Sequence, residues 1–384
     1  MRDPSLRPAL AGTIALCTGI GLARFAYVPL FPAMVTAGWV GGGEAGLLGA
    51  ANFTGHLAGA LTANRVAARL GTARALDAGV ALVLLAFLAC ALHLLDPWGV
   101  PWFAAWRTLG GYAGGVLLSV TGPAVQAVTP PERRGAAGGI VMAGVGVGVV
   151  LVSLTVPPLL ALGGVAGAWL GLGALTAVLW AFAHPAWPVP PPAPPPMPGA
   201  TAAARTPRGI LWAYALSGAG MTAPMIYLSD LAARGHGLGV ALGGMVWGLF
   251  GLGVLAGTLL GGRAADRLGA SRTMLLWLAV QVAALTCTLV PHPASLVPAA
   301  LLSGFAGVGI TAVALAGIRA AVGAATPRRW AAATALYGLL QVGVGYALAA
   351  IFAGTGGSHA AVFGVGLVLS VAGLAVAARD VARR

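Results

Sequence analysis

The sequence contains very little charge for its length, and little of that charge is negative. Of its 384 residues only 8% are charged, whereas 59% are hydrophobic. A soluble domain carries about 25% charged residues, so this composition excludes a soluble globular protein and predicts an integral membrane protein. Lysine is absent, so all 21 basic side chains are arginines, against 8 acidic ones. The basic excess does not indicate nucleic-acid binding, because the arginines are spread over short segments between apolar runs.

Cysteine is also scarce. Cys17, Cys90 and Cys287 are the only cysteines, all three fall inside apolar runs, and their spacing indicates neither a metal site nor a disulfide. The sequence shows no Ser/His/Asp constellation, metal-ligand cluster or nucleotide-binding loop. We therefore expect neither enzyme activity nor a bound cofactor or metal.

Long apolar runs fill the sequence instead. Glycine is frequent, at 60 residues, and small residues allow helices to approach closely in lipid. Twelve segments are long enough to cross a bilayer as helices, at about 20 residues per span. They cover residues 10–32, 44–63, 75–95, 101–127, 136–160, 165–183, 209–229, 239–261, 273–291, 295–318, 330–352 and 359–378.

A proline-rich stretch separates the first six segments from the last six. Residues 185–198 hold nine prolines, and such a sequence forms an extended, semi-rigid spacer. The predicted organisation is an N-terminal six-helix bundle over 1–183, a cytoplasmic linker over 184–208 and a C-terminal six-helix bundle over 209–384.

The arginines predict how these segments cross the membrane. If the N-terminus lies inside, eighteen of the 21 arginines fall in inner loops or inner termini, and only Arg234 falls in an outer loop. The remaining two, Arg24 and Arg107, lie within spans. By the positive-inside rule we expect a multi-pass protein of the cytoplasmic (inner) cell membrane with both termini in the cytoplasm.

The two halves repeat one another. Residues 57–74 align without gaps with residues 255–272, and ten of the eighteen pairs are identical. Each copy joins the second and third segments of its half. Two six-helix halves with the same orientation form the parallel repeat of a secondary transporter, whose site lies between the halves near the membrane midplane.

The repeated loop resembles a signature of the major facilitator superfamily. Gly262-x-x-x-Asp266-Arg267-Leu268-Gly269-x-x-Arg272 matches the loop motif, and Arg107-x-x-x-Gly111 resembles the fourth-helix motif. The resemblance implies an all-α integral membrane protein with the major facilitator fold: 12 transmembrane helices in two six-helix bundles related by pseudo-two-fold symmetry.

The same resemblance implies a cytoplasmic gate at Asp266, Arg267 and Arg272. The first-half copy keeps Arg65 and Arg69 as gate candidates, but Asn64 and Ala68 stand where the motif has Gly and Asp. Within the superfamily, residues 19–27, 51–59 and 144–148 resemble the YbfB/YjiJ-type transporters. The resemblance implies transport of a small molecule and names no substrate.

Arg24 lies near the middle of the first apolar run, where a charge costs between about 3 and 10 or more kcal/mol. Pro29 and Pro32 each remove a helix hydrogen bond, so the helix end that carries Arg24 is expected to be bent. Arg107 falls at a similar depth in the fourth segment. We expect both arginines to line a central site.

Two interpretations of Arg24 and Arg107 are open. In the first, they bind the carboxylate or phosphate group of an anionic substrate through bidentate hydrogen bonds. In the second, they bond carbonyl groups freed by Pro29, or pair with Glu44 or Asp230 as part of an outer gate.

Other polar side chains lie within the predicted spans. His56 is a candidate proton carrier, and a histidine bonded to a neighbouring helix is the alternative. Tyr27, Asn52, Tyr112 and Gln341 are candidate substrate-binding groups, and interhelical hydrogen bonding is the alternative for each.

The sequence favours a secondary active transporter that moves a small anionic solute by alternating access. One alternative is a proton-coupled exporter of lipophilic or cationic compounds, and another is a receptor or scaffold that does not transport. The expected partners are the substrate, the lipid bilayer and a coupling proton, without nucleic acid, and the expected state is a monomer.

Overall fold

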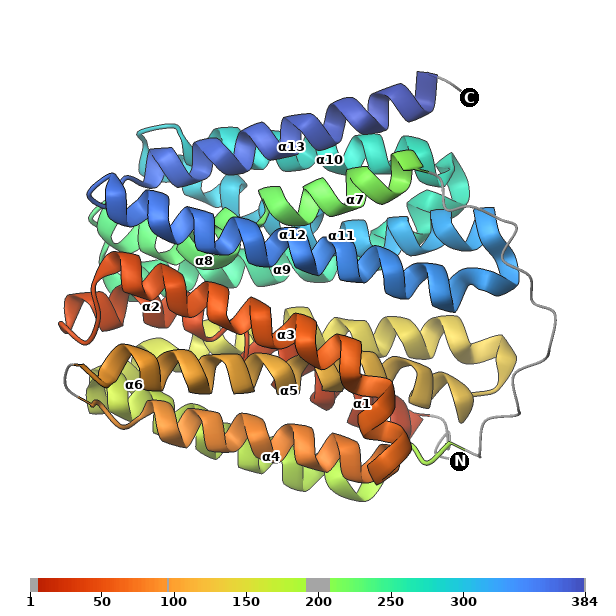
Figure 1. Cartoon of the computed structure of the whole chain (residues 1–384), viewed down its shortest axis with the longest axis horizontal. Helices are drawn as coiled ribbons and strands as arrows, with labels where there is room; N and C mark the ends of the chain where they lie inside the picture. The colour runs from red at the N-terminus through yellow and green to blue at the C-terminus, as the bar shows by residue number, and fades with distance from the viewer. Residues whose placement is uncertain (1–5, 95–96, 191–207, 383–384) are drawn as a thin grey trace.

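The computed structural model describes residues 6–94, 97–190 and 208–382, and these residues contain helices and connecting turns but no strand. The chain folds as a bundle of long helices that run nearly side by side (Figure 1). The α-helices are α1 (Leu6–Leu16), α2 (Tyr27–Thr36), α3 (Gly42–Leu70), α4 (Thr72–Cys90), α5 (Gly99–Ala127), α6 (Arg134–Ala183), α7 (Arg208–Gly220), α8 (Thr222–Asp230), α9 (Gly239–Leu268), α10 (Ala270–Thr288), α11 (Leu296–Val322), α12 (Thr326–Gly354) and α13 (His359–Ala382).

Short helices of other kinds lie between them. Two are π-helical turns, η1 (Cys17–Leu22) and η4 (Leu231–Gly235), and both interrupt or end a membrane-length helix. Four are 3₁₀ turns, namely η2 (Pro131–Arg133), η3 (His184–Ala186), η5 (Pro293–Ser295) and η6 (Gly323–Ala325).

The all-helical membrane fold is confirmed, but the count of twelve spans is not reproduced exactly. Eight helical runs in the described residues are long and apolar enough to cross a membrane. One of them, Pro131–Ala186, covers both the fifth and the sixth predicted segments. The non-helical residues Gly163 and Gly164 form a kink between these two segments. Gly164 has a φ of 59°, which a side chain would disfavour.

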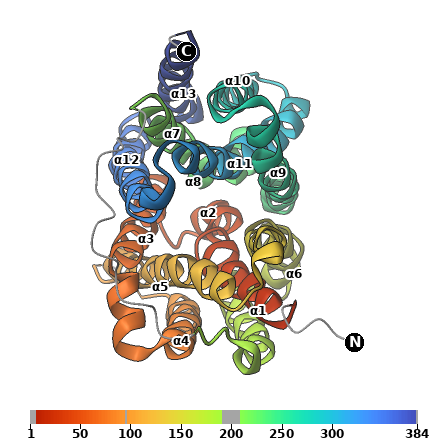
Figure 2. The ribbon, with the colours of Figure 1, turned by 90° about the vertical axis from the view of Figure 1, so that its right-hand side faces the viewer.

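The helices form two groups that face each other across one seam. Seen from the end of the bundle, α1–α6 lie on one side and α7–α13 on the other (Figure 2). Glycines mark the contacts between the groups: a Cβ at Gly345 of α12 would lie 3.1 Å from Ala50 of α3, and one at Gly248 of α9 would lie 3.1 Å from Ser153 of α6. The seam therefore runs along the pairs α3–α12 and α6–α9.

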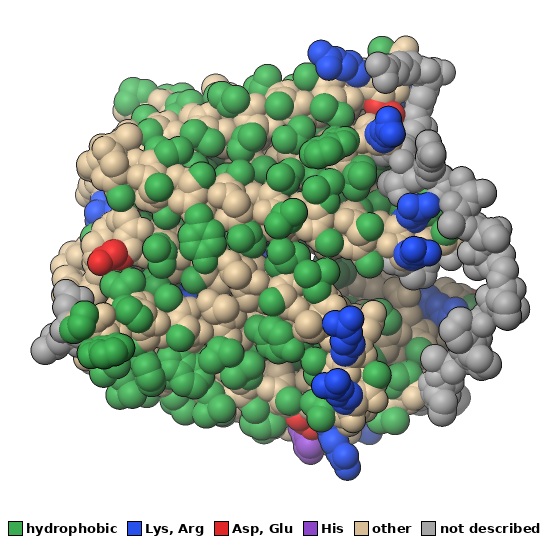
Figure 3. Space-filling model, in the orientation of Figure 1, with side chains coloured by type: hydrophobic (Ala, Val, Ile, Leu, Met, Phe, Trp, Pro, Cys, Tyr) green, Lys and Arg blue, Asp and Glu red, His purple; other side chains and the backbone are tan. Residues whose placement is uncertain are grey.

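The two ends of the bundle differ in charge. Figure 3 shows arginine side chains gathered at the end where α1 begins and α13 ends, called the basic end below. Arg65, Arg69, Arg263 and Arg267 are exposed on the helix ends found there. This distribution follows the arginine pattern of the sequence, which places these residues in loops on one side.

The two groups are packed together from the end opposite the basic end to about the middle of the bundle, where Gly338 of α12 meets Leu57 of α3. One buried apolar cluster runs through the first group and continues into the second, where its members range from Met221 to Phe363. Near the basic end, the second group keeps a separate cluster around Tyr214, Trp277 and Ile310. Figure 3 shows the surface hollowed between the two groups at the basic end. The structure is therefore open toward the basic end and closed at the opposite end.

A carboxylate fastens the start of the predicted linker to the first group. Asp77 Oδ1 on α4 accepts hydrogen bonds from Trp180 Nε1 and Trp187 Nε1, each at 2.7 Å, and lies 2.9 Å from His184 Nδ1. The remainder of the predicted linker, residues 191–207, lies outside the described residues.

Close helix contacts make a stability test possible within α5. A Cβ at Gly115 would overlap the backbone carbonyl of His56 and lie 2.7 Å from Ala60 N, whereas one at Gly122 would meet nothing within 4 Å. We expect Gly115→Ala to lower stability by about 1–3 kcal/mol, because the α3–α5 pair must separate. Gly122→Ala should be neutral or stabilising by up to about 1 kcal/mol. Thermal melts in detergent check both, and equal melting temperatures would contradict the packing argument.

Candidate functional site

The first membrane-length helix is broken where it carries Arg24. The π-helix η1 ends at Leu22, a turn covers residues 23–26, and α2 begins at Tyr27. The backbone N–H of Ala23 bonds the carbonyl of Thr18 at 2.9 Å, which is the wider spacing of a π-helix. Pro29 and Pro32 lie just beyond, in the first turns of α2. The predicted irregularity at Arg24 is therefore present.

Arg24 reaches from this break across the seam into the second group. Its Nη2 donates to Gln341 Oε1 of α12 at 2.7 Å and lies 3.9 Å from Met225 Sδ of α8. Its guanidinium carbon lies 4.4 Å from the centre of the Phe53 ring. The side chain is 9% exposed, and its Nε has no hydrogen-bond partner. The groups in contact with this guanidinium are therefore neutral, and none of them is a carboxylate.

The two carboxylates considered as partners for Arg24 are engaged elsewhere. Glu44 Oε2 accepts from the backbone N–H of Gly41 at 2.6 Å, where it caps its own helix. Asp230 binds Arg234 and His359. Neither carboxylate contacts Arg24.

Arg107 faces the same break but bonds its backbone. Its Nη1 donates to the carbonyl of Ala23 at 2.8 Å, and its Nη2 lies 3.4 Å from the carbonyl of Arg24. Its guanidinium carbon lies 4.4 Å from the centre of the Tyr27 ring. Both are carbonyls of the break. Neither is the carbonyl freed by Pro29, which is that of Phe25, four residues before the proline. Arg107 thus holds the segment that carries Arg24.

Asn52 adds to this support from α3. Its amide nitrogen donates to the carbonyl of Ala23 at 3.3 Å and to the carbonyl of Arg107 at 3.0 Å. Asn52 is fully buried. A residue proposed to contact substrate is therefore found in interhelical hydrogen bonds, which was the alternative for it.

The other predicted site residues are divided between the centre and its surroundings. Gln341 is in the centre as the partner of Arg24. Tyr27 donates to the carbonyl of Ala45 at 2.8 Å, and Tyr112 accepts from Thr62 Oγ1 at 3.1 Å, nearer the basic end. His56 is half-buried one helical turn beyond Asn52 and within electrostatic range of Arg24.

Several residues at the centre were not predicted to bind substrate, although the sequence made Tyr337 a plausible polar group of the cavity. Phe53 and Met225 contact Arg24, and Tyr214 and Tyr337 lie within its electrostatic range. The rings of Tyr214 and Tyr337 stack with centroids 4.6 Å apart. Tyr337 precedes Gln341 by four residues, so a shared helix face was the available signal. Apolar residues such as Met225 gave no such signal.

The predicted gate residues lie at the basic end. Arg65 and Arg69 are exposed at the end of α3, and Asp266, Arg267 and Arg272 are exposed around the turn from α9 to α10. Within the described ranges none of these five side chains forms an ion pair with another. This is the arrangement expected of a gate that is open, since the two groups are apart at this end.

The family model described as "Uncharacterised MFS-type transporter YbfB" matches residues 16–377. The chain belongs to this family of the major facilitator superfamily. No curated protein matches it.

Solved transporters share the fold of this family member. The partially occluded, inward-open xylose transporter XylE from E. coli is similar with a TM-score of 0.73, at 12% identity and with 96% of each chain covered. A peptide transporter in complex with alafosfalin has a TM-score of 0.72, at 17% identity and with 99% of each chain covered. A bacterial homolog of the human lysosomal transporter Spinster, inward-facing and unoccupied, has a TM-score of 0.67, at 15% identity, and covers 98% of this chain and 95% of its own.

These identities show the fold and carry no substrate to this chain. The family and the fold together establish a multi-pass membrane transporter of the major facilitator superfamily, which is not an enzyme. Secondary transport by alternating access follows, in which a central site opens to one membrane face at a time.

Proposed function

We propose that this transporter moves a small anionic solute, and that Arg24 binds its carboxylate or phosphate group. The observation that carries the proposal is a guanidinium buried at the seam of the two groups, with a neutral amide and a thioether as its polar contacts. A buried charge is costly unless it is paired and hydrogen-bonded. A substrate anion supplies the missing charge at the point where both groups of helices contact it.

The hydrogen-bonding capacity of Arg24 supports this role. A guanidinium offers five N–H donors in a planar fork that matches a carboxylate or phosphate. Only Nη2 donates to another side chain here, and Nε has no partner. Arg107 and Asn52 fix the backbone of the break, so the fork is held in place before substrate arrives. In this proposal Arg107 positions Arg24, and its own charge adds to the positive potential of the site.

The same charges disfavour the exporter of lipophilic cations. Arg24 and Arg107 are both buried near one point of the seam, and a cation placed there would be repelled. His56 is half-buried on α3, and its role as a proton carrier stays a prediction.

We further infer that the basic end faces the cytoplasm of the cell membrane, because positive residues accumulate in cytoplasmic loops. In that orientation the structure is open to the inside, both termini are cytoplasmic, and residues 184–208 link the bundles 1–183 and 209–384 on the inner face. Asp266, Arg267 and Arg272 would meet the opposing bundle when this end closes.

A stabilisation screen of the purified protein tests the proposed substrate class. Ligands that bind the folded state raise its melting temperature by mass action. We expect shifts with small carboxylates or phosphates, and we expect these shifts to be lost in Arg24→Gln and kept in Arg74→Ala, which removes an exposed arginine at the end of the bundle. Shifts with lipophilic cations alone would overturn the proposal in favour of the exporter. A ligand that binds but never exchanges across liposomes would indicate a receptor.

A further inference from the structure

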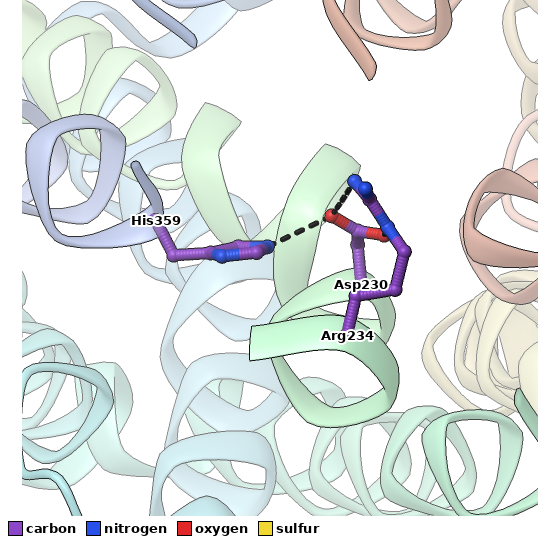
Figure 4. Close-up of polar contacts among 3 residues, drawn as sticks. All are labelled: Asp230, Arg234 and His359. Carbon is purple, nitrogen blue, oxygen red and sulfur yellow. Dashed lines mark hydrogen bonds and ion pairs between the residues drawn. The ribbon is translucent and has the colours of Figure 1, made fainter. Parts of the chain in front are cut away.

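The end opposite the basic end contains a buried charge cluster that the substrate site does not use. Asp230, the last residue of α8, is 0% exposed and is the only fully buried carboxylate in the described parts of the chain. Arg234 and His359 both point at it (Figure 4). The cluster lies where the two groups of helices are closed against each other.

Arg234 links this carboxylate to the opposing group. Its Nε and Nη2 bond Asp230 Oδ1 and Oδ2 at 2.5 and 2.7 Å, a bidentate ion pair. The guanidinium carbon lies 5.9 Å from the centre of the Phe31 ring of α2, and a Cβ at Gly42 of α3 would lie 3.5 Å from Nη2. Asp230 thereby holds the Arg234 side chain of the second group of helices in contact with α2 and α3 of the first group.

Aromatic rings surround the ion pair and complete the closure. Phe31 lies 5.4 Å from Tyr227 and 6.3 Å from Phe352, measured between ring centres. Phe352 in turn lies 5.2 Å from the His359 ring. Separating the two groups at this end requires Arg234 and these rings to move apart.

His359 gives the buried carboxylate a route to water. Its Nε2 donates to Asp230 Oδ2 at 2.8 Å, and its side chain is 13% exposed, whereas that of Asp230 is 0% exposed. A histidine whose Nε2 carries the proton leaves Nδ1 free to accept one. Histidine is also the side chain that changes charge between about pH 5 and pH 8.

We propose that Asp230 and His359 form a proton-binding site that controls opening of the end opposite the basic end. A proton from bulk water adds to His359 Nδ1, and the proton on Nε2 passes to Asp230 Oδ2. The histidine is then neutral with its proton on Nδ1, and the aspartic acid is neutral. The cluster has gained one proton, so its net charge rises from zero to +1. Arg234 is then its only charged side chain.

Protonation weakens the contact between Arg234 and Asp230. The charge-assisted bonds of Arg234 become bonds to a neutral acid, which are roughly half as strong. Arg234 is left as an unpaired cation beside apolar rings. Its side chain is already 32% exposed, so it turns toward water and releases the opposing group. Acid therefore favours opening at this end.

Other ionisable groups near the cluster do not replace this route. His236, two residues beyond Arg234, forms no side-chain bond with Asp230, whose partners are Arg234 and His359. Tyr227 and Tyr27 lie within electrostatic range of Asp230, but their hydroxyls are protonated over the range in which histidine titrates. Glu44 of α3 caps its own helix. At this end α9, α12 and the described part of α13 beyond His359 contribute no further charged side chain.

Thiol labelling of purified protein in lipid nanodiscs measures the opening directly, without a substrate. Ala349 of α12 is 5% exposed and faces Gly46 of α3, so Ala349→Cys is labelled by a maleimide only when this end opens. Thr355→Cys, in the exposed turn directly after the same helix, corrects for the intrinsic pH dependence of the reaction. Both variants carry Cys287→Ala, and a protein with Cys287→Ala alone gives the background from the buried Cys17 and Cys90.

We expect the corrected labelling rate to rise at least about fivefold between about pH 8 and pH 5.5, since an equilibrium linked to one proton changes by up to about tenfold per pH unit. Asp230→Asn should label rapidly at both pH values. His359→Gln keeps a hydrogen-bond donor but cannot titrate, so it should label slowly at both.

Three results would overturn the proposal: a rate that is constant or falls in acid, the native pH response in His359→Gln, or slow labelling of folded Asp230→Asn at high pH. If Asp230→Asn does not fold, His359→Gln decides alone. Because no substrate is present, failure here leaves the anion proposal intact, and failure of the anion screen leaves this proton site intact.

Discussion

Arg24→Ala is expected to abolish transport while the protein remains folded. Losing a charge-assisted contact to a buried ligand costs about 2–5 kcal/mol, so uptake or exchange of the stabilising anion in proteoliposomes should fall at least about thirtyfold. Stability should not fall with it, because no carboxylate compensates this buried cation in the structure. Combined transport and melting measurements on one preparation check both parts.

Two variants make this result specific. Arg24→Lys keeps the charge but cannot present a planar fork, so it should remain well below the wild type. Arg74→Ala removes an exposed arginine near the start of α4 and should transport normally. Wild-type transport by Arg24→Ala would remove this residue from the mechanism and leave the two-bundle carrier without an identified site.

A disulfide across the α3–α12 seam is expected to stop transport completely. A Cβ at Gly345 would lie 3.1 Å from Ala50 Cβ, and a small adjustment reaches the 3.5–4.5 Å that a disulfide requires. Alternating access needs this seam to separate at the end opposite the basic end. Oxidised Ala50→Cys/Gly345→Cys should therefore be inactive in counterflow, in a Cys287→Ala background.

The reduced protein is the control for this prediction. Addition of a thiol reductant should restore exchange, and each single cysteine variant should be unaffected by the oxidant. A cross-linked protein that still exchanges substrate at the wild-type rate would contradict movement along this seam.

Much of the fold could be predicted from the sequence because its determinants are local. Apolar length predicts a membrane helix, and the arginine loops and the repeat at residues 57–74 and 255–272 predict two similar halves. The exact span count could not be read in the same way. The fifth and sixth predicted segments follow each other with only the kink at Gly163 and Gly164 between them, and the break at residues 23–26 and that near Met221 split single segments into two helices.

The site was only partly predictable, because its contacts join residues far apart in the chain. The depth of Arg24 and the prolines after it indicated a bent, functional helix. Its partner Gln341 lies 317 residues away, and whether that residue or Glu44 would meet the guanidinium depends on packing between the two groups. Asn52 and Arg107 bind backbone carbonyls of the break, which no side-chain pattern specifies.

The cluster of Asp230, Arg234 and His359 shows the same limit. Asp230 and Arg234 are separated by four residues on adjoining helical turns, so their pairing was visible in principle. His359 is 129 residues from Asp230, and only the fold brings the start of α13 to the end of α8. Its effect on the carboxylate is therefore a property of the tertiary structure.

Calorimetric titration of the strongest stabilising anion against wild type and Arg24→Gln tests the central claim most directly. The glutamine keeps two donors but removes the charge, so the account predicts a dissociation constant raised at least about thirtyfold, equivalent to about 2 kcal/mol. A dissociation constant that is the same in the two proteins would contradict binding of the substrate anion by Arg24.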